Sequence, residues 1–170
     1  PATIEWDAKD MLIYSIDIET SSEGGFPNVD MPDERLLLIT LQDNNTKKIT
    51  TFGCGDFVLG DATKHLDVTY INCQDEKNLI QEFLIWWENN CPDVITGWNS
   101  NLFDLPYIIA RTERVLGENE HKRYSPFGLV NRRPIKFANR EMTAYEITGV
   151  AQLDYLDLYK KFTYVTRESY

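Results

Sequence analysis

Two carboxylates stand two residues apart in the segment MLIYSIDIET, residues 11–20. Apolar and polar residues alternate in this segment, which predicts a β-strand that presents Asp17 and Glu19 on the same face. Carboxylate oxygens placed in this way suit hard divalent cations such as Mg²⁺. The alternative is an ordinary solvent-facing pair. The other face of the strand is strongly apolar, however, which favours a central strand on which two carboxylates repel each other unless a cation neutralises them.

A third carboxylate, Asp104, follows a short apolar run at residues 94–96. That run predicts a buried strand, and Asp104-Leu105-Pro106 predicts the first turn of a helix. Loops near strand ends are frequent positions for functional residues. The alternative role of Asp104 is to cap the helix. In the intervening loop, Asn99 and Phe103 have the alternative roles of a turn residue and a core aromatic residue.

Together, the three carboxylates could hold two divalent ions about 3.5–4 Å apart. One ion would activate a water molecule as the nucleophile, and the other would stabilise the leaving oxygen of a phosphodiester. Asn99 and Phe103 would then hold a sugar and a base, the aromatic ring by stacking. Phosphate contacts are expected from basic residues around a predicted hairpin, with a solvated loop as the alternative: Arg132, Arg133, Lys136 and Arg140.

The predicted elements are typical of a mixed α/β domain. They are, in order, strand 11–20, an acidic loop at 21–34, a hairpin of Arg35–Asp43 and Thr46–Phe52, strand 70–73, a helix that Asp75 opens, strand 94–96, a helix from Asp104 to near Gly117, a hairpin of Pro134–Phe137 and Glu141–Ile147, strand 153–156 and a helix over 158–162. Antiparallel strands followed by β-α-β alternation predict a mixed sheet flanked by helices, with the second hairpin inserted.

Composition restricts the class of protein. The 170 residues are 42% hydrophobic and 12% aromatic, which is typical of one globular domain. No apolar run reaches the roughly 18 residues of a membrane helix. Three cysteines without a C-x-x-C pair indicate a reducing compartment and partly buried apolar side chains. The net charge of −10 divides into −14 for residues 1–120 and +4 for residues 121–170. This asymmetry suggests that carboxylates gather on one face of the protein and that another face meets anions. The alternative is that surface charge merely varies along the chain.

Three segments resemble the exonuclease domain of family B DNA polymerases. Asp17-Ile18-Glu19-Thr20 is similar to the first exonuclease motif of that family, and the segment 96–107 resembles the second, with its N-x-x-x-F-D core. The segment LDYLDLYKKF, residues 153–162, resembles the one that follows in polymerases of T-even-type bacteriophages. The resemblance extends from about residue 11 to the end of the chain.

This resemblance implies an RNase H-like fold and a 3′→5′ proofreading exonuclease of the DEDD class. It implies that Asp17, Glu19 and Asp104 are catalytic and bind two Mg²⁺ or Mn²⁺ ions, and that Thr20, Asn99 and Phe103 contact the 3′ end of a single-stranded DNA primer. The hairpin over 134–149 would help to part primer from template. The implied partners are the remaining polymerase domains and, through the full polymerase, a sliding clamp. The expected location is the cytoplasm, that of the host cell if the gene belongs to a phage, with no membrane.

The third motif of the family, Y-x-x-x-D, is missing after Leu153. It would supply a fourth metal-binding Asp and a Tyr that orients the attacking water; Tyr155 and Tyr159 have the spacing, but the second is not an Asp. Residues 1–170 are therefore expected to form a single, partial exonuclease domain that is weak or inactive alone. Two alternatives stay open. One is a non-catalytic module for single-stranded DNA binding and interdomain packing, and the other is glycoside hydrolysis by paired acids, which same-face carboxylates suit less well.

Overall fold

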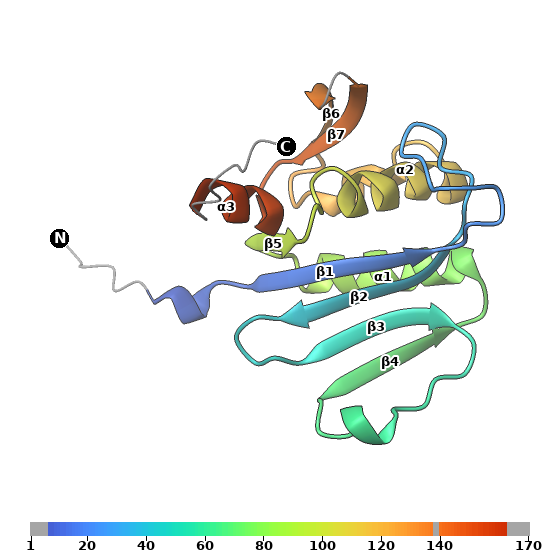
Figure 1. Ribbon diagram of the computed structural model, residues 1–170, viewed down its shortest axis with the longest axis vertical. Helices are drawn as coiled ribbons and strands as arrows, with labels where there is room; N and C mark the ends of the chain where they lie inside the picture. Colours follow the sequence, from blue (N-terminus) through green and yellow to red (C-terminus); the bar gives the residue numbers. More distant parts are fainter. Residues whose placement is uncertain (1–6, 138–139, 163–170) are drawn as a thin grey trace, which may run out of the picture.

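A six-stranded mixed sheet forms the centre of the computed structural model, which describes residues 7–137 and 140–162 (Figure 1). The strand order is β4-β3-β2-β1-β5-β8. The strands are β1 (Ile13–Thr20), β2 (Leu36–Asp43), β3 (Ile49–Cys54), β4 (Val68–Cys73), β5 (Val94–Gly97) and β8 (Ala151–Asp154). Strands β1, β2 and β3 are antiparallel neighbours, whereas β4 runs parallel to β3, and β1, β5 and β8 run parallel to one another. This arrangement confirms the predicted mixed sheet and agrees with an RNase H-like fold.

Strand β1 lies inside the sheet, between β2 and β5. Its residues alternate as predicted, with Ile16 and Ile18 buried and Asp17 and Glu19 exposed. The ring of Tyr14, which shares the apolar face, meets the ring of Trp86 in helix α1 (Glu76–Asn89) edge to face at 5.1 Å. The two carboxylates therefore leave the face of the sheet opposite to α1.

Helix α1 begins where the sequence predicts. Asp75 is its N-cap and accepts a hydrogen bond of 2.8 Å from the N–H of Asn78. The helix buries one apolar stripe against β2, β3 and β4 and passes behind β1 and β2 in Figure 1. The stripe consists of Leu79, Ile80, Phe83, Leu84 and Trp87. These side chains join those of the sheet in a single core.

Two further helices flank the sheet. Helix α2 (Asp104–Leu116) follows β5 and contacts β1 and α1, and helix α3 (Tyr155–Phe162) follows β8 and buries none of its side chains. Among the described residues there are also three short 3₁₀ turns: Ala8–Asp10, Asp61–Thr63 and Glu120–Tyr124. No helix in the described part of the chain has both the length and the apolar character needed to span a membrane.

The second hairpin forms a separate two-stranded sheet of β6 (Val130–Phe137) and β7 (Arg140–Ile147). It projects beside α2 and α3 in Figure 1. Strand β6 begins four residues before the predicted start at Pro134, because Val130 pairs with Ile147 and the ladder continues from there. Of the predicted turn residues, 138 and 139 lie outside the described residues.

Three boundaries differ from prediction for local reasons. The carboxylate of Asp43 accepts hydrogen bonds from the N–H groups of Asn45 and Thr46, so β3 starts later than expected, at Ile49. The carboxylate of Asp154 accepts a hydrogen bond from the N–H of Leu156, so β8 ends and α3 begins earlier than expected.

The three cysteines are free thiols. Cys73 is buried and Cys91 is half-buried, as predicted. Cys54 is exposed, so the prediction that it is partly buried is wrong.

Candidate functional site

Asp17 and Glu19 project from the middle and the end of β1. Asp17 stands opposite Thr40 of β2, and Glu19 stands opposite Leu38. The register between β1 and β2 shifts directly after Glu19, so Thr20 lies at an irregularity of the ladder and is half-buried. The segment of β1 that carries the two carboxylates is paired with β2, while β5 pairs with β1 over residues 13–15 and α1 packs on its apolar face. The backbone therefore holds both carboxylates in place.

Asp104 is buried, with 5% of its surface exposed, and it lies beside β1. Its Oδ1 accepts a hydrogen bond of 3.1 Å from the N–H of Ile18, the residue between Asp17 and Glu19. Helix α2 begins at Asp104, but the N-cap position belongs to Phe103 and carries no side-chain cap bond, so the capping alternative for Asp104 is wrong. The carboxylate of Asp104 is instead held against the acidic strand.

The electrostatics of Asp104 reflect this position. The pKa of its carboxyl group is raised to about 7, chiefly by burial, next by the negative charge of Asp17, and to a smaller extent by Asp154. Hydrogen bonds from the N–H groups of Asp104 itself and of Ile18 oppose the shift. The neighbouring carboxylate and the burial thus disfavour the ionised form of Asp104, and a cation bound beside the pair would favour that form.

The donor chemistry of these side chains fits a hard divalent cation, since all three supply carboxylate oxygens. Within residues 7–137 and 140–162, however, no group of three or more His, Cys, Asp or Glu residues is close enough to hold a metal ion. The structure brings Asp104 to Asp17 and does not bring Glu19 into a closed three-acid cluster with them.

Asp154 is a buried acid that sequence reasoning did not single out. It ends β8, is 4% exposed, and accepts hydrogen bonds from the N–H groups of Asn99 (2.9 Å) and Asn101 (3.0 Å). Asn99 is half-buried with a left-handed φ of 62°, which Asn tolerates better than most residues. Asp154 therefore fixes the loop that leads from β5 to Phe103 and Asp104. An Asp between a strand and a helix is the only local signal in the sequence for this role.

Close packing holds β5 against β1 at the start of that loop. A Cβ on Gly97 would lie 2.7 Å from the carbonyl oxygen of Ile16 and 2.8 Å from Cβ of Ser100. Glycine is required here because the backbones of the two strands approach each other directly beside Asp17.

Phe103 is half-buried and forms part of an aromatic row rather than the centre of the core. Its ring stacks on Tyr107 of α2 with centroids 5.7 Å apart, and it meets the ring of Phe26 at 6.0 Å. Phe26 belongs to the loop after β1 and is 88% exposed. Sequence reasoning missed Phe26 because a single Phe in a Gly- and Pro-containing loop carries no periodicity.

A groove of about 400 Å³ runs from this aromatic pair to the second hairpin. Its walls come from the loop after β1, from Leu102 and Phe103, and from β7. Asp30 connects the two sides, because its carboxylate accepts hydrogen bonds from Thr143 of β7 at 2.6 Å and from Arg132 of β6 at 3.2 Å.

The predicted phosphate-binding residues lie on the hairpin in different settings. Arg132 and Arg133 are exposed and form ion pairs with Asp30 and Glu146, respectively. Lys136 is exposed. Arg140 begins β7, and its side chain lies outside the described residues.

Comparison with known proteins assigns the chain to a family. The family model for the exonuclease domain of DNA polymerase family B matches residues 3–170. The chain therefore belongs to the exonuclease domains of family B DNA polymerases, as the motifs around Asp17 and Asp104 indicate.

Individual relatives agree with this assignment. The chain is 31% identical over 188 residues to the DNA-directed DNA polymerase of Enterobacteria phage T4, and 28% identical over 190 residues to that of Escherichia phage RB69; each alignment covers 98% of this chain and 21% of the phage protein. It is 32% identical over 160 residues to the DNA polymerase catalytic subunit of Rhesus cytomegalovirus (strain 68-1), covering 82% of this chain and 15% of the viral one. The chain thus spans about a fifth of the length of the phage relatives.

Proposed function

We propose that the chain acts as the 3′→5′ proofreading exonuclease of a DNA polymerase and hydrolyses the terminal phosphodiester of a single-stranded primer end. The observation that carries this proposal is the contact between Asp104 and β1. It sets a buried carboxylate of raised pKa beside Asp17, within the two motifs that the family shares. Nuclease activity follows from membership of the family. The proofreading role and the single-stranded primer as substrate are what we propose beyond it.

The metal ions belong to the same proposal. Asp17, Glu19 and Asp104 would hold two Mg²⁺ or Mn²⁺ ions. Bound there, the ions would lower the pKa of a water nucleophile and stabilise charge on the leaving oxygen. The N–H of Ile18 would keep the Asp104 carboxylate turned toward the site. In a DEDD-type site a fourth carboxylate is needed, and we propose that it lies outside these 170 residues, which would then form a partial domain.

Substrate contacts would come from the groove between the aromatic pair and the second hairpin. The rings of Phe103 and Phe26 offer stacking surfaces for the terminal bases. Thr20, which follows Glu19 at the end of β1, and Asn99, in the loop before Asp104, would contact the sugar. The exposed cations of the hairpin, Arg132, Arg133, Lys136 and Arg140, would contact phosphates. The remaining polymerase domains, and a sliding clamp acting through them in the cytoplasm, are the further proposed partners.

Digestion of a 5′-labelled single-stranded oligonucleotide tests the function. The natural full-length protein should shorten it from the 3′ end in Mg²⁺ but not in EDTA. Asp17→Ala and Asp104→Ala should each lower the rate more than about a hundredfold, because even outer-shell partners of metal ligands cost 10–100-fold when removed. Asp67→Ala is the matched control, since Asp67 is an exposed acid beside the edge strand β4. A full-length protein that degrades no DNA in Mg²⁺ or Mn²⁺ would contradict the proposal.

A second candidate function is single-stranded DNA binding without cleavage. One observation favours it: no three-acid metal cluster occurs in the described part of the chain. On this alternative, DNA affinity survives Asp17→Ala and the full-length protein cleaves nothing. The two functions are separated by measuring DNA binding and digestion side by side for the wild type and this variant. The 170-residue chain alone should bind DNA but cleave it weakly or not at all.

A further inference from the structure

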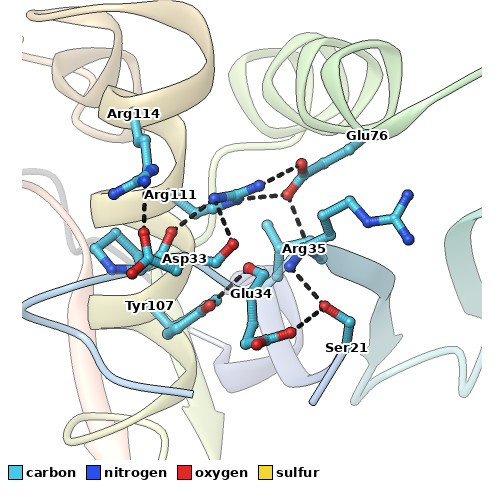
Figure 2. Close-up of polar contacts among 10 residues, drawn as sticks. Ser21, Asp33, Glu34, Arg35, Glu76, Tyr107, Arg111 and Arg114 are labelled. Carbon is cyan, nitrogen blue, oxygen red and sulfur yellow. Dashed lines mark hydrogen bonds and ion pairs between the residues drawn. The ribbon is translucent and has the colours of Figure 1, made fainter. Parts of the chain in front are cut away.

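The loop that carries Phe26 is closed by its own ends. The N–H of Ser21 donates to the carbonyl of Arg35 at 2.8 Å, and the N–H of Arg35 donates to Oγ of Ser21 at 2.9 Å. Figure 2 shows this closure next to Glu34. The loop thus begins directly after Glu19 and Thr20 and returns to the sheet where β2 begins.

The carboxylate of Glu34 fastens the first half of this loop. It accepts hydrogen bonds from the hydroxyl of Ser21 (2.5 Å) and from the N–H groups of Glu23 (3.1 Å) and Gly24 (2.5 Å). These bonds hold the pKa of Glu34 below its usual range, the hydroxyl of Ser21 contributing most. A Cβ on Gly24 would lie 2.7 Å from Oε1 of Glu34, so the backbone is pressed directly against the carboxylate. Phe26 follows two residues later.

The carbonyl oxygen of Glu34 fastens the same loop to α2. It accepts a hydrogen bond of 2.6 Å from the hydroxyl of Tyr107, as Figure 2 shows. The ring of Tyr107 stacks on Phe103, and Phe103 meets Phe26. One closed chain of contacts therefore runs from Glu34 through Tyr107 and Phe103 to Phe26, and back along the loop to Glu34.

We propose that Glu34 is a positioning residue that fixes the distance between Phe26 and Phe103 and so shapes the aromatic wall of the DNA groove. This inference rests on the proposed function, because it takes a single-stranded DNA end to be the occupant of that groove. Glu34 acts through the two rings and touches neither the DNA nor the reacting atoms.

The base of the loop is held independently of Glu34. The guanidinium of Arg111 donates to the carbonyls of Pro32 (2.6 Å) and Asp33 (3.2 Å) and pairs with both carboxylate oxygens of Glu76 (Figure 2). These contacts keep the chain near residue 34 in place when the Glu34 carboxylate is altered. A change at Glu34 should therefore act on the first half of the loop and on Phe26, and not on the fold as a whole.

The test is a double-mutant cycle in the full-length protein. Glu34→Gln keeps the shape of the side chain, but its NH₂ group cannot accept the hydrogen bonds that one carboxylate oxygen accepts. Phe26→Ala removes the exposed ring. Glu23→Gln is the matched control, because it makes the same charge change in the same loop and its carboxylate forms only an exposed contact with Arg35 at 3.9 Å. Affinity for a fluorescently labelled single-stranded oligonucleotide is measured by anisotropy in EDTA, and KM and kcat are measured in Mg²⁺.

We expect Glu34→Gln to raise Kd and KM about fivefold and to leave kcat within about twofold, as for the loss of one net hydrogen bond. Phe26→Ala should raise Kd about tenfold, and adding Glu34→Gln to it should raise Kd no further. Glu23→Gln should match the wild type. Unchanged affinity in Glu34→Gln, effects that add fully in the double variant, or a fall in kcat alone would each overturn the proposal.

Three further outcomes complete the test. If Glu34→Gln does not fold, Tyr107→Phe replaces it in the cycle, because this variant keeps the stacked ring and removes only the hydrogen bond to the carbonyl of Glu34. Tyr107→Phe should then show the same rise in Kd, and its effect should not add to that of Phe26→Ala. If the wild type binds DNA but cleaves none, the proposed exonuclease function fails while the anisotropy cycle still decides the role of Glu34. A wild type that binds no single-stranded DNA overturns both.

Discussion

The N–H of Ile18 donates a hydrogen bond of 3.1 Å to Oδ1 of Asp104, although 86 positions separate the two residues in the chain. The bond ties the first residue of α2 to the middle of β1, between Asp17 and Glu19. Because Asp104 is buried there beside another carboxylate, its ionisation is coupled to the stability of the fold.

This coupling predicts a dependence of stability on pH. The pKa of Asp104 is about 7 in the folded protein, against an ordinary value of 3.8. Between these values the folded state keeps a proton that the unfolded state has lost, so this residue's contribution to the free energy of unfolding falls as pH rises. Asp104→Asn should match the wild type near pH 4 and exceed it by about 2–4 kcal/mol at pH 8, as measured by denaturant unfolding of the chain in EDTA.

Two controls accompany that measurement. Asp17→Asn should also stabilise the chain at pH 8, since the charge of Asp17 contributes to the raised pKa of Asp104. Added Mg²⁺ should stabilise the wild type more than Asp104→Asn, because a ligand that binds only the folded state shifts the equilibrium toward it. Equal stability of Asp104→Asn and wild type across the whole pH range would contradict the assigned pKa.

Asp154 should control the order of the loop before α2. Its carboxylate accepts the N–H groups of Asn99 and Asn101, and Asp154→Asn replaces one accepting oxygen with a donor. We expect these two amide protons to exchange about 5–10 times faster in the variant, as for a loss of roughly 1 kcal/mol of local stability. Hydrogen exchange followed by NMR measures this. The amide of Leu79, which donates to the carbonyl of Asp75 at the start of α1, is the internal reference; equal acceleration there would indicate global rather than local destabilisation.

Local patterns in the sequence were sufficient to predict much of the fold. The alternation along β1 predicts the exposed face that carries Asp17 and Glu19, and the apolar spacing after Asp75 predicts α1 and its buried stripe. These signals work because a strand and a helix each repeat with a fixed period, so burial on one side leaves a regular pattern.

Features that depend on contacts between distant segments could not be predicted in this way. Phe26 lies on Phe103, and the Asp104 carboxylate binds the backbone of Ile18, but neither partner is marked by the residues around it. The length of β6 likewise depends on its pairing with β7 and not on the propensity of the polar residues 131–133. Tertiary structure therefore supplied the aromatic groove and the setting of Asp104.

The ion pair of Arg111 and Glu76 should contribute far more to the free energy of unfolding than the nearby ion pair of Arg114 and Asp33. The side chains of Arg111 and Glu76 are both largely buried, and the guanidinium donates to both carboxylate oxygens at 2.6 and 2.7 Å. Arg111→Ala leaves the carboxylate of Glu76 without its charged partner and should cost about 3–5 kcal/mol in denaturant unfolding. Arg114→Ala is the control, since its pair with Asp33 is more than half exposed and should be worth less than about 1 kcal/mol. Similar losses for the two variants would contradict this assignment.

Each cation of the second hairpin should make its own contribution to DNA affinity. The dependence of the binding constant on salt concentration can measure these contributions one at a time. Each phosphate contact on single-stranded DNA adds about 0.7 to the slope of log K against log salt concentration. Lys136→Ala should therefore reduce this slope by about 0.7 in anisotropy titrations of the full-length protein, with affinity lowered most at low salt. Lys48→Ala, which removes an exposed cation from the β2–β3 connection, should leave the slope unchanged.

Arg133 provides an opposite test on the same hairpin, because it is already paired with Glu146 at 2.9 Å. Glu146→Gln removes the anion that pairs with Arg133 and frees the guanidinium, so it should strengthen binding and steepen the salt dependence. If Lys136→Ala and Glu146→Gln both leave the slope at the wild-type value, the hairpin does not contact phosphates and its cations form a solvated surface.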